Sequence, residues 1–237
     1  MIKTYVAFDL ETTGLDVEND NIIEIGALKV CDGKVTERFM EFLKPDEPIS
    51  PMITNITGIT NEMVENAGKT DKIIRDFVDF CGENILVGHN IAFDYRFMKR
   101  YAVQYGYSFD KNGIDTLKIA RKVHKNLESK SLGALCEYYK IVNQAAHRAY
   151  HDALATAKLY HMLAHYFEEK YASLLVPETL ACKPKKVQPA TQKQKDYLKA
   201  LVLFHNLELP DDYQMLTRSR ASKMIDKIIL EHGNLKR

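Results

Sequence analysis

Three β-rich segments open the chain, and they constrain its fold more than any other feature. We predict strands over residues 3–9, 22–31 and 34–43, because each segment is short and rich in β-branched and aromatic residues. Asp32-Gly33 separates the second segment from the third and is a strong signal for a hairpin turn. The N-terminal part should therefore form antiparallel strands.

Helical and strand-like patterns alternate after these segments. A stretch with Pro45, Pro48 and Pro51 predicts a loop, and a short helix should begin near Thr60. Strands are then predicted over 84–87 and 113–115, and helices over 71–81, 92–105, 131–139 and 148–169. Strands that alternate with helices pair in parallel, so we expect an α/β fold whose mixed sheet is flanked by helices.

A change in composition marks the end of this α/β region. Pro177, Pro184 and Pro189, together with several lysines, are typical of a linker. Two short amphipathic helices follow, over about 191–206 and 217–232. We therefore predict three parts, which are a main domain over residues 1–175, a linker over 176–190 and a small helical C-terminal module over 191–237.

Charge is distributed unevenly between these parts. The formal net charge of the 237-residue chain is +1, but residues 183–237 hold 12 Lys and Arg against 6 Asp and Glu. The remaining residues hold 21 basic and 26 acidic side chains. The basic module could contact nucleic-acid phosphates, or its lysines could simply aid solubility, and the sequence leaves both interpretations open.

Other features narrow the class of protein. No apolar run approaches the roughly 18 residues that span a bilayer, and the N-terminus leads directly into a strand-like segment, so we expect neither a membrane segment nor a signal peptide. The four cysteines are far apart and form no C-x-x-C pair. A zinc site or a disulfide framework is therefore not expected, and a reducing cytoplasm suits the chain.

Asp9 and Glu11 are the first candidate site residues. They lie two positions apart at the end of the first predicted strand, so their carboxylates should point to the same face of the sheet. Two neighbouring acids repel each other unless a cation lies between them. The pair therefore predicts a metal site, and the structural alternative is two solvated acids beside a turn.

Asp94 follows a buried strand and lies at the start of a predicted helix. Sites in open α/β sheets collect where strands end, which favours a functional interpretation of this acid. The alternative is an acid that interacts favourably with the helix dipole. Asn90, just before the helix, could cap it or contact a substrate, and the sequence does not separate these roles.

His147 and Asp152 form the third candidate element. On an ideal helix, residues five apart point about 140° away from each other, so the two could not easily serve one site. They could do so if His147 lies on the loop just before the helix and Asp152 lies in its first turn. The nearby His151 is interpreted as a surface or packing residue.

These residues occur in three motifs that resemble those of a known family. The motifs are Asp9-x-Glu11-Thr12-Thr13-Gly14, His89-Asn90-x-x-Phe93-Asp94 and His147-x-x-x-x-Asp152. In this order they resemble the exonuclease motifs of the DEDDh 3′–5′ exonuclease family, which includes the proofreading epsilon subunit of bacterial DNA polymerase III and the exonuclease domain of the Gram-positive replicative polymerase. The resemblance covers about residues 1–170, and the histidine of the third motif indicates the histidine branch.

The resemblance implies a ribonuclease H-like fold and two Mg²⁺ or Mn²⁺ ions. It implies that Asp9, Glu11, Asp94 and Asp152 bind the metals and that His147 is the general base. Glu11 is thereby expected to have a catalytic role as well. By the same resemblance, Thr12, Thr13 and Leu15 contact the terminal nucleotide, and Asn90 remains a candidate substrate contact. Oxygen ligands suit Mg²⁺ and Mn²⁺, and a histidine that titrates near neutral pH can accept a proton from water.

The expected function is release of nucleoside monophosphates from single-stranded or frayed DNA 3′ ends. RNA trimming by the same site is an alternative, and so is a non-catalytic nucleic-acid-binding scaffold, although the complete set of site residues argues against the latter. We find no polymerase domain, so proofreading in DNA replication would require a DNA polymerase as partner. The C-terminal module loosely resembles a helical module of phage and bacterial DNA-handling proteins.

Overall fold

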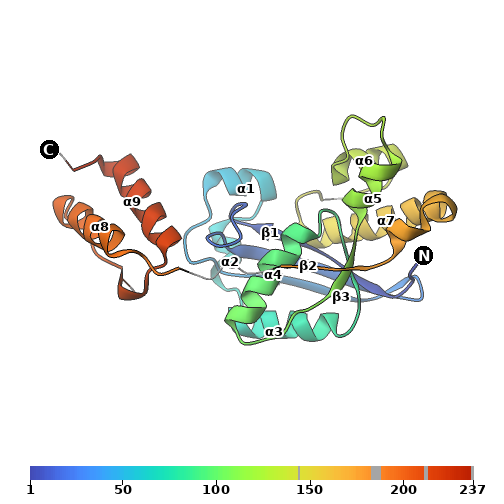
Figure 1. Cartoon of the computed structure of the whole chain (residues 1–237), viewed down its shortest axis with the longest axis horizontal. Coiled ribbons are helices and arrows are strands. Elements are labelled where there is room, and N and C mark those ends of the chain that lie inside the picture. The colour runs from blue at the N-terminus through green and yellow to red at the C-terminus, as the bar shows by residue number, and fades with distance from the viewer. Residues whose placement is uncertain (144, 183–187, 211–212, 236–237) are drawn as a thin grey trace. The chain divides into compact units, whose positions relative to one another are not determined.

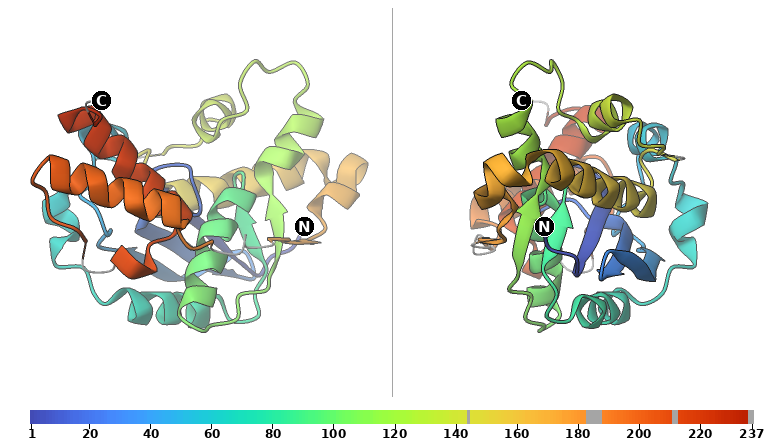
Figure 2. Two further views of the ribbon diagram at one scale, coloured as in Figure 1. Left: turned by 60° about the vertical axis from the view of Figure 1, so that its left-hand side comes forward. Right: turned by 90° about the vertical axis from the view of Figure 1, so that its right-hand side faces the viewer.

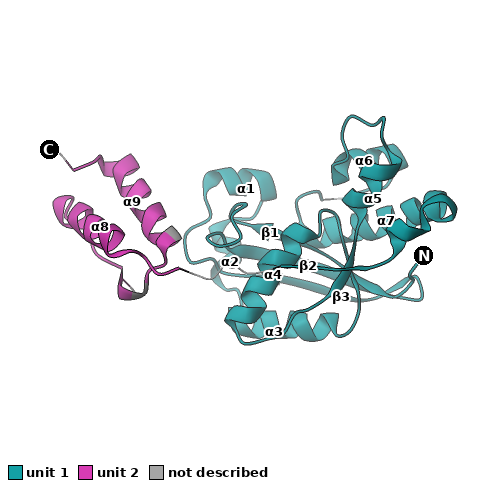
Figure 3. Cartoon of the chain, viewed as in Figure 1, with its two compact units in different colours: residues 1–184 teal, residues 185–237 magenta. Residues whose placement is uncertain are grey.

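The computed structural model describes residues 1–143, 145–182, 188–210 and 213–235 (Figure 1). The chain divides into two compact units, residues 1–184 and 185–237 (Figure 3). Each unit has a hydrophobic core of its own. No helix of the described residues is long and apolar enough to cross a membrane.

The first unit is built on a six-stranded mixed sheet with the order β3-β2-β1-β4-β5-β6. Its strands are β1 (Tyr5–Thr12), β2 (Ile22–Cys31), β3 (Lys34–Phe42), β4 (Leu86–Gly88), β5 (Asn112–Asp115) and β6 (Glu178–Thr179). The pairs β1–β2, β2–β3 and β5–β6 are antiparallel, whereas β1–β4 and β4–β5 are parallel. The predicted mixed sheet is therefore confirmed.

Helices cover both faces of this sheet (Figure 2). One face packs against α3 (Thr70–Cys81) and α4 (Ala92–Gln104). The other face packs against α5 (Thr116–Val123), α6 (Leu132–Tyr139) and α7 (Ala149–Tyr171). A 3₁₀ turn, η1 (Ala172–Leu175), directly follows α7.

The side chains of β1 alternate between these two layers. Val6, Phe8 and Leu10 belong to the core under α3 and α4, and Tyr5 and Ala7 belong to the core under α7. Successive side chains of a strand point to opposite faces. The next odd-numbered residues of β1 therefore point to the α7 face.

Helix α7 lies directly against β2. A Cβ atom added to Gly26 would lie only 1.9 Å from the backbone nitrogen of Tyr150, so no larger residue fits there unless the helix moves. The buried Ala149, Ala153 and Ala157 also allow the helix to approach closely. This packing brings the N-terminus of α7 close to the C-terminal end of β1.

Two predictions of local structure are wrong. Strand β1 does not end at residue 9 as predicted but continues to Thr12, because Glu11 pairs with Glu24 of β2. Helix α1 (Pro51–Thr57) forms in the predicted proline-rich loop. Pro51 begins this helix, and the Ser50 hydroxyl accepts a hydrogen bond from the Ile53 N–H, which are both favourable features of a helix start. The short α2 (Asn61–Glu65) follows.

The predicted linker over residues 176–190 is too long. Strand β6 pairs with β5, and the Leu180 N–H donates a hydrogen bond to the Lys111 carbonyl. Leu180 and Cys182 pack against the core under α3 and α4. The segment up to Cys182 is therefore part of the first unit, and residues 183–187 lie outside the described residues.

The second unit contains α8 (Gln192–Phe204), η2 (Tyr213–Met215) and α9 (Arg218–His232). Thr191 and Gln194 form a reciprocal capping box at the start of α8, and Thr217 caps α9. Leu198, Leu201, Leu216, Ala221 and Ile225 are central to the core between the helices. Both helices predicted for this part of the chain are present.

Candidate active site

The acidic pair of β1 lies on the α7 face of the sheet. Asp9 pairs with Gly26 and Glu11 with Glu24 in the antiparallel register of β1 and β2. Glu11 is buried, with 8% of its surface exposed, although it lies near the end of its strand. The alternative of two solvated acids beside a turn is therefore excluded for Glu11.

Asp94 joins α4 to this end of β1. It lies in the first turn of α4 and is buried. Its Oδ1 accepts a hydrogen bond of 3.1 Å from the backbone N–H of Leu10, the residue between Asp9 and Glu11. The second motif is therefore tied to the first by a direct contact between residues 84 positions apart.

His147 and Asp152 converge because the histidine precedes α7. The backbone of His147 has a φ of 62°, in the left-handed region that non-glycine residues seldom adopt. Its N–H donates a hydrogen bond of 2.8 Å to Oδ2 of Asp152, and the Asn143 side chain donates one of 2.6 Å to Oδ1. This turn allows two residues five positions apart to meet, with His147 just before the helix and Asp152 in its first turn, which is the arrangement that the sequence analysis described.

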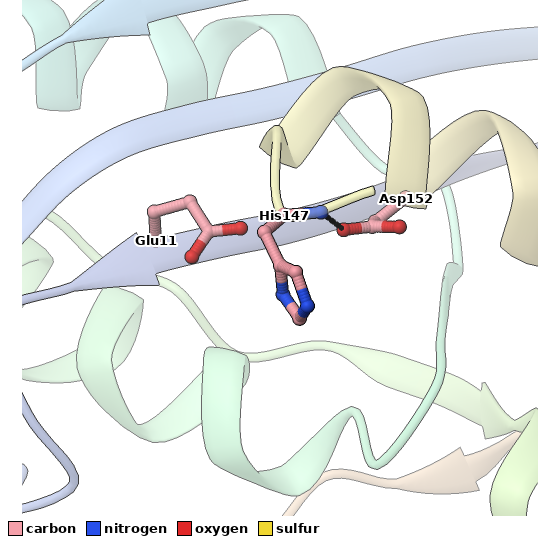
Figure 4. A group of neighbouring side chains, drawn as sticks. All are labelled: Glu11, His147 and Asp152. Carbon is pink, nitrogen blue, oxygen red and sulfur yellow. Dashed lines mark hydrogen bonds between the residues drawn. The ribbon is translucent and has the colours of Figure 1, made fainter. Parts of the chain in front are cut away.

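Glu11, His147 and Asp152 form a compact group. Each offers one potential ligand atom, and these atoms all lie within 4.8 Å of one another (Figure 4). Glu11 and Asp152 are buried, whereas the His147 side chain is exposed. Asp9 and Asp94 are not members of this three-residue group, but their charges interact with it.

Burial raises the pKa values of all four acids, and repulsion from the other acids adds to the shifts of Asp9 and Glu11. Burial, followed by the charges of Asp152, Glu24 and Asp94, raises the pKa of Glu11 to about 8. Burial also raises the pKa of Asp94 to about 8, although hydrogen bonds from backbone N–H groups oppose the shift.

The remaining two acids shift in the same direction. Burial raises the pKa of Asp9 well above its ordinary value, and the charges of Asp94, Asp152, Glu11 and Glu24 add to this shift. Burial raises the pKa of Asp152, against the hydrogen bonds from Asn143 and His147. Cations bound at this site would favour the ionised forms of the four carboxylates.

Glu24 and Arg148 were not singled out by the sequence analysis. Only 3% of the Glu24 surface is exposed, and its carboxylate accepts hydrogen bonds from the guanidinium of Arg148 at 2.9–3.3 Å and from the Ala149 N–H at 3.1 Å. The available signal was an acid within the otherwise apolar strand segment 22–28. A buried acid requires a partner, and only the fold shows which one.

The four predicted substrate contacts differ in accessibility. The Thr12 hydroxyl donates to the Gly14 carbonyl, and the Thr13 hydroxyl accepts from the Asn21 N–H, so both shape the loop after β1. The side chain of Leu15 is 84% exposed. Asn90 is exposed with a φ of 66°, and its side chain does not cap α4, which removes one of its two predicted roles.

Comparison with known proteins gives a family match. Residues 6–160 match the sequence model of the family described as "Exonuclease". "DNA polymerase III PolC-type" of Caldanaerobacter subterraneus is 38% identical over 156 residues, which are 66% of this chain and 11% of that protein. The chain thus spans about a tenth of the length of such relatives.

Two further proteins are matched over most of their length. "DNA polymerase III subunit epsilon" of Aquifex aeolicus is 37% identical over 158 residues, which are 66% of this chain and 78% of that protein. A solved structure of "Exonuclease X in complex with 5′ overhanging duplex DNA" is 28% identical with a TM-score of 0.58. The likeness covers 73% of this chain and 99% of that one.

Proposed function

The chain belongs to the exonuclease family, and from this premise we propose that it removes nucleoside monophosphates one at a time from the 3′ ends of DNA strands. The observation that carries the proposal is the convergence of Glu11, His147 and Asp152 within 4.8 Å at the end of β1. The hydrogen bond from the Leu10 N–H to the Asp94 carboxylate adds a third motif acid to the same end of the strand.

The proposed cofactors are two Mg²⁺ or Mn²⁺ ions held by Asp9, Glu11, Asp94 and Asp152. The donor set fits such ions, because carboxylate oxygens suit hard divalent cations and burial raises the pKa of each of the four acids, so that nearby positive charge would favour their ionised forms. When bound, the two ions would polarise the phosphodiester and stabilise the departing 3′-oxygen.

His147 is proposed as the general base. Its side chain is exposed beside two of the proposed ligands, so a water molecule can reach it. A histidine can take the proton of the attacking water while the new P–O bond forms and the bond to the leaving 3′-oxygen breaks. The hydrogen bond from its N–H to Asp152 holds the loop in place during this step.

The loop after β1 supports a preference for unpaired ends. Leu15 extends into solvent from this loop and can wedge against the terminal base. Thr12, Thr13 and Asn90 are proposed to surround the same nucleotide. A paired 3′ end would have to fray before it entered, which costs a few kcal/mol, so single strands and mismatched ends should be cut faster.

The partners are proposed from the names of the relatives. Several relatives are DNA polymerase III proteins, so we propose a DNA polymerase as partner in proofreading during replication, with the cytoplasm as the site of action. The second unit is proposed to add nucleic-acid contacts through its basic residues.

The test uses strands labelled at the 5′ end, namely single-stranded DNA, duplex DNA and RNA, each with Mg²⁺ or Mn²⁺. Removal from the 3′ end predicts a descending ladder on single-stranded DNA, slower loss from the duplex and a slower reaction with a 3′-phosphate. Early release of the labelled 5′ mononucleotide, or ready cleavage of a circular single strand, would contradict the proposal. Faster loss of the RNA would instead assign the site to RNA trimming.

A further inference from the structure

A cavity of about 270 Å³ lies beside the acidic site and is lined by residues of α7, by Arg38 of β3, and by Val142 and Asn143. Tyr150 and Leu154 of α7 form its apolar wall, and Arg38 and Lys158 contribute the charges at its rim. No acidic side chain lines it among the described residues. The cavity therefore has the character of an anion site with an apolar surface.

The two cations of the cavity are available to a ligand. Arg38 and Lys158 are both exposed, and neither forms an ion pair with a described residue. The Arg38 guanidinium lies 5.5 Å from the centre of the Tyr150 ring, which orients it across the gap between β3 and α7. Tyr150 itself is buried and gives the cavity a fixed wall.

The cavity shares a side chain with the acidic site. Asn143 lines the cavity and also donates the 2.6 Å hydrogen bond to Oδ1 of Asp152. Tyr150 and Leu154 lie two positions before and after Asp152 on α7. A ligand in the cavity would therefore be one side chain away from a proposed metal ligand.

We propose that this cavity binds the phosphate on the 5′ side of the scissile phosphate in the substrate strand. The inference rests on the proposed function, because only a nucleic-acid strand places a second phosphate at a fixed distance from the first. Arg38 and Lys158 neutralise that phosphate, and the wall formed by Tyr150 and Leu154 packs against the attached sugar or base. Free phosphate carries the same kind of charge, but it lacks the sugar and base that would pack against Tyr150 and Leu154.

Binding tests the inference independently of catalysis. The Arg38→Ala/Lys158→Ala double variant is compared with wild type for binding of a fluorescent oligothymidylate in EDTA, which suppresses hydrolysis. Loss of two exposed phosphate contacts should weaken binding about tenfold. The slope of log affinity against log salt should fall by about 1.4, or about 0.7 per lost contact on a single strand.

A matched control and a competitor complete the binding experiment. Lys69→Ala removes an exposed cation at the start of α3, on the opposite face of the sheet, and should leave affinity and salt slope unchanged. Inorganic phosphate should compete only weakly with the oligothymidylate. Equal affinity of the double variant and wild type, or displacement of the strand by phosphate at low concentration, would overturn the assignment.

Hydrolysis provides a second readout that separates this inference from the proposed function. A thymidine dinucleotide has only the scissile phosphate, so the double variant should cut it as fast as wild type does, while kcat/KM for a longer strand falls about tenfold. Equal losses on both substrates would make the cations structural and refute the phosphate site. If the wild-type protein cuts neither substrate, the proposed function is refuted. The binding experiment would still test whether the cavity binds a phosphate of the strand.

Discussion

The carboxylate of Glu24 on β2 holds the guanidinium of Arg148 at the start of α7, with the shortest of its hydrogen bonds at 2.9 Å. The same carboxylate accepts the N–H of Ala149, and the Phe42 ring lies 5.4 Å below the guanidinium. Because His147 directly precedes Arg148, these contacts fix the backbone position from which the His147 side chain extends. Glu24 therefore helps to position the proposed base.

Arg148→Ala should destabilise the protein and slow the reaction. It leaves the buried Glu24 without its cationic partner, and we expect a loss of about 2 kcal/mol in unfolding free energy. The fold loss in kcat should exceed the fold change in the metal concentration that gives half-maximal activity. The reason is that the variant displaces His147 more than it displaces the proposed metal ligands. Arg148→Lys should recover part of kcat. Denaturant melts and metal titrations of the rate would measure these effects, and an unchanged kcat in Arg148→Ala would refute the positioning role.

Asp94→Asn should nearly abolish hydrolysis without unfolding the protein. Loss of a proposed ligand should lower the rate at least about 10²-fold, since each metal supplies several kcal/mol of charge stabilisation. In EDTA the variant should melt at or above the wild-type temperature, because an uncharged amide replaces a buried acid. Asp79→Asn, at an exposed position on α3, is the control. Near-normal activity at limiting metal would remove Asp94 from the ligand set.

Stability of the metal-free protein should decrease as pH rises. The pKa of Glu11 is raised from 4.5 to about 8 in the folded protein, so folding favours its protonated form. The resulting stabilisation is complete below the unfolded pKa and is lost as pH rises through the folded one. Melting temperatures in EDTA should therefore fall between about pH 4.5 and pH 8, and Mg²⁺ should raise them most at the alkaline end. The same melts on Glu11→Gln should show a smaller pH dependence, and a rise in wild-type stability over this range would contradict the prediction.

His147→Ala should lower the rate by about 10²–10⁴-fold while metal binding is largely retained, as expected for loss of a general base. His165→Ala, at an exposed position farther along α7, should have little effect. Single-turnover rates and metal titrations distinguish the two outcomes. An equal loss in both variants would show that the effect is not specific to the proposed base.

Removal of the second unit should weaken binding but leave the chemistry intact. A chain of residues 1–184 retains every motif and the segment that includes Leu180 and Cys182. Its turnover number should match that of the full chain, while its affinity for single-stranded DNA and its salt dependence should both fall. A chain that ends before β6 should be less stable, because Leu180 would no longer cover its part of the core. Equal affinity and equal salt slope in the first comparison would assign the second unit a role other than nucleic-acid binding.

Local patterns in the sequence were sufficient for much of the fold and for the choice of site residues. Strand alternation alone places Asp9 and Glu11 on one face, and the structure puts that face under α7. The order and spacing of the three motifs led, through their resemblance to a known family, to the proposed roles of the remaining acids and the histidine. The inference about the strand holds because it depends on side-chain period, which the local sequence determines.

Contacts between distant residues decided the rest. The left-handed turn at His147 persists because Asp152 accepts its N–H, and Arg148 is held by an acid 124 positions away. Strand β6 forms only because β5 offers it an edge. No local propensity encodes such pairings, since their free energy arises when the completed fold brings both partners together. The sequence by itself determined which side chains are candidates for the chemistry, and the tertiary structure decided how they are supported and which side chains lie beside them.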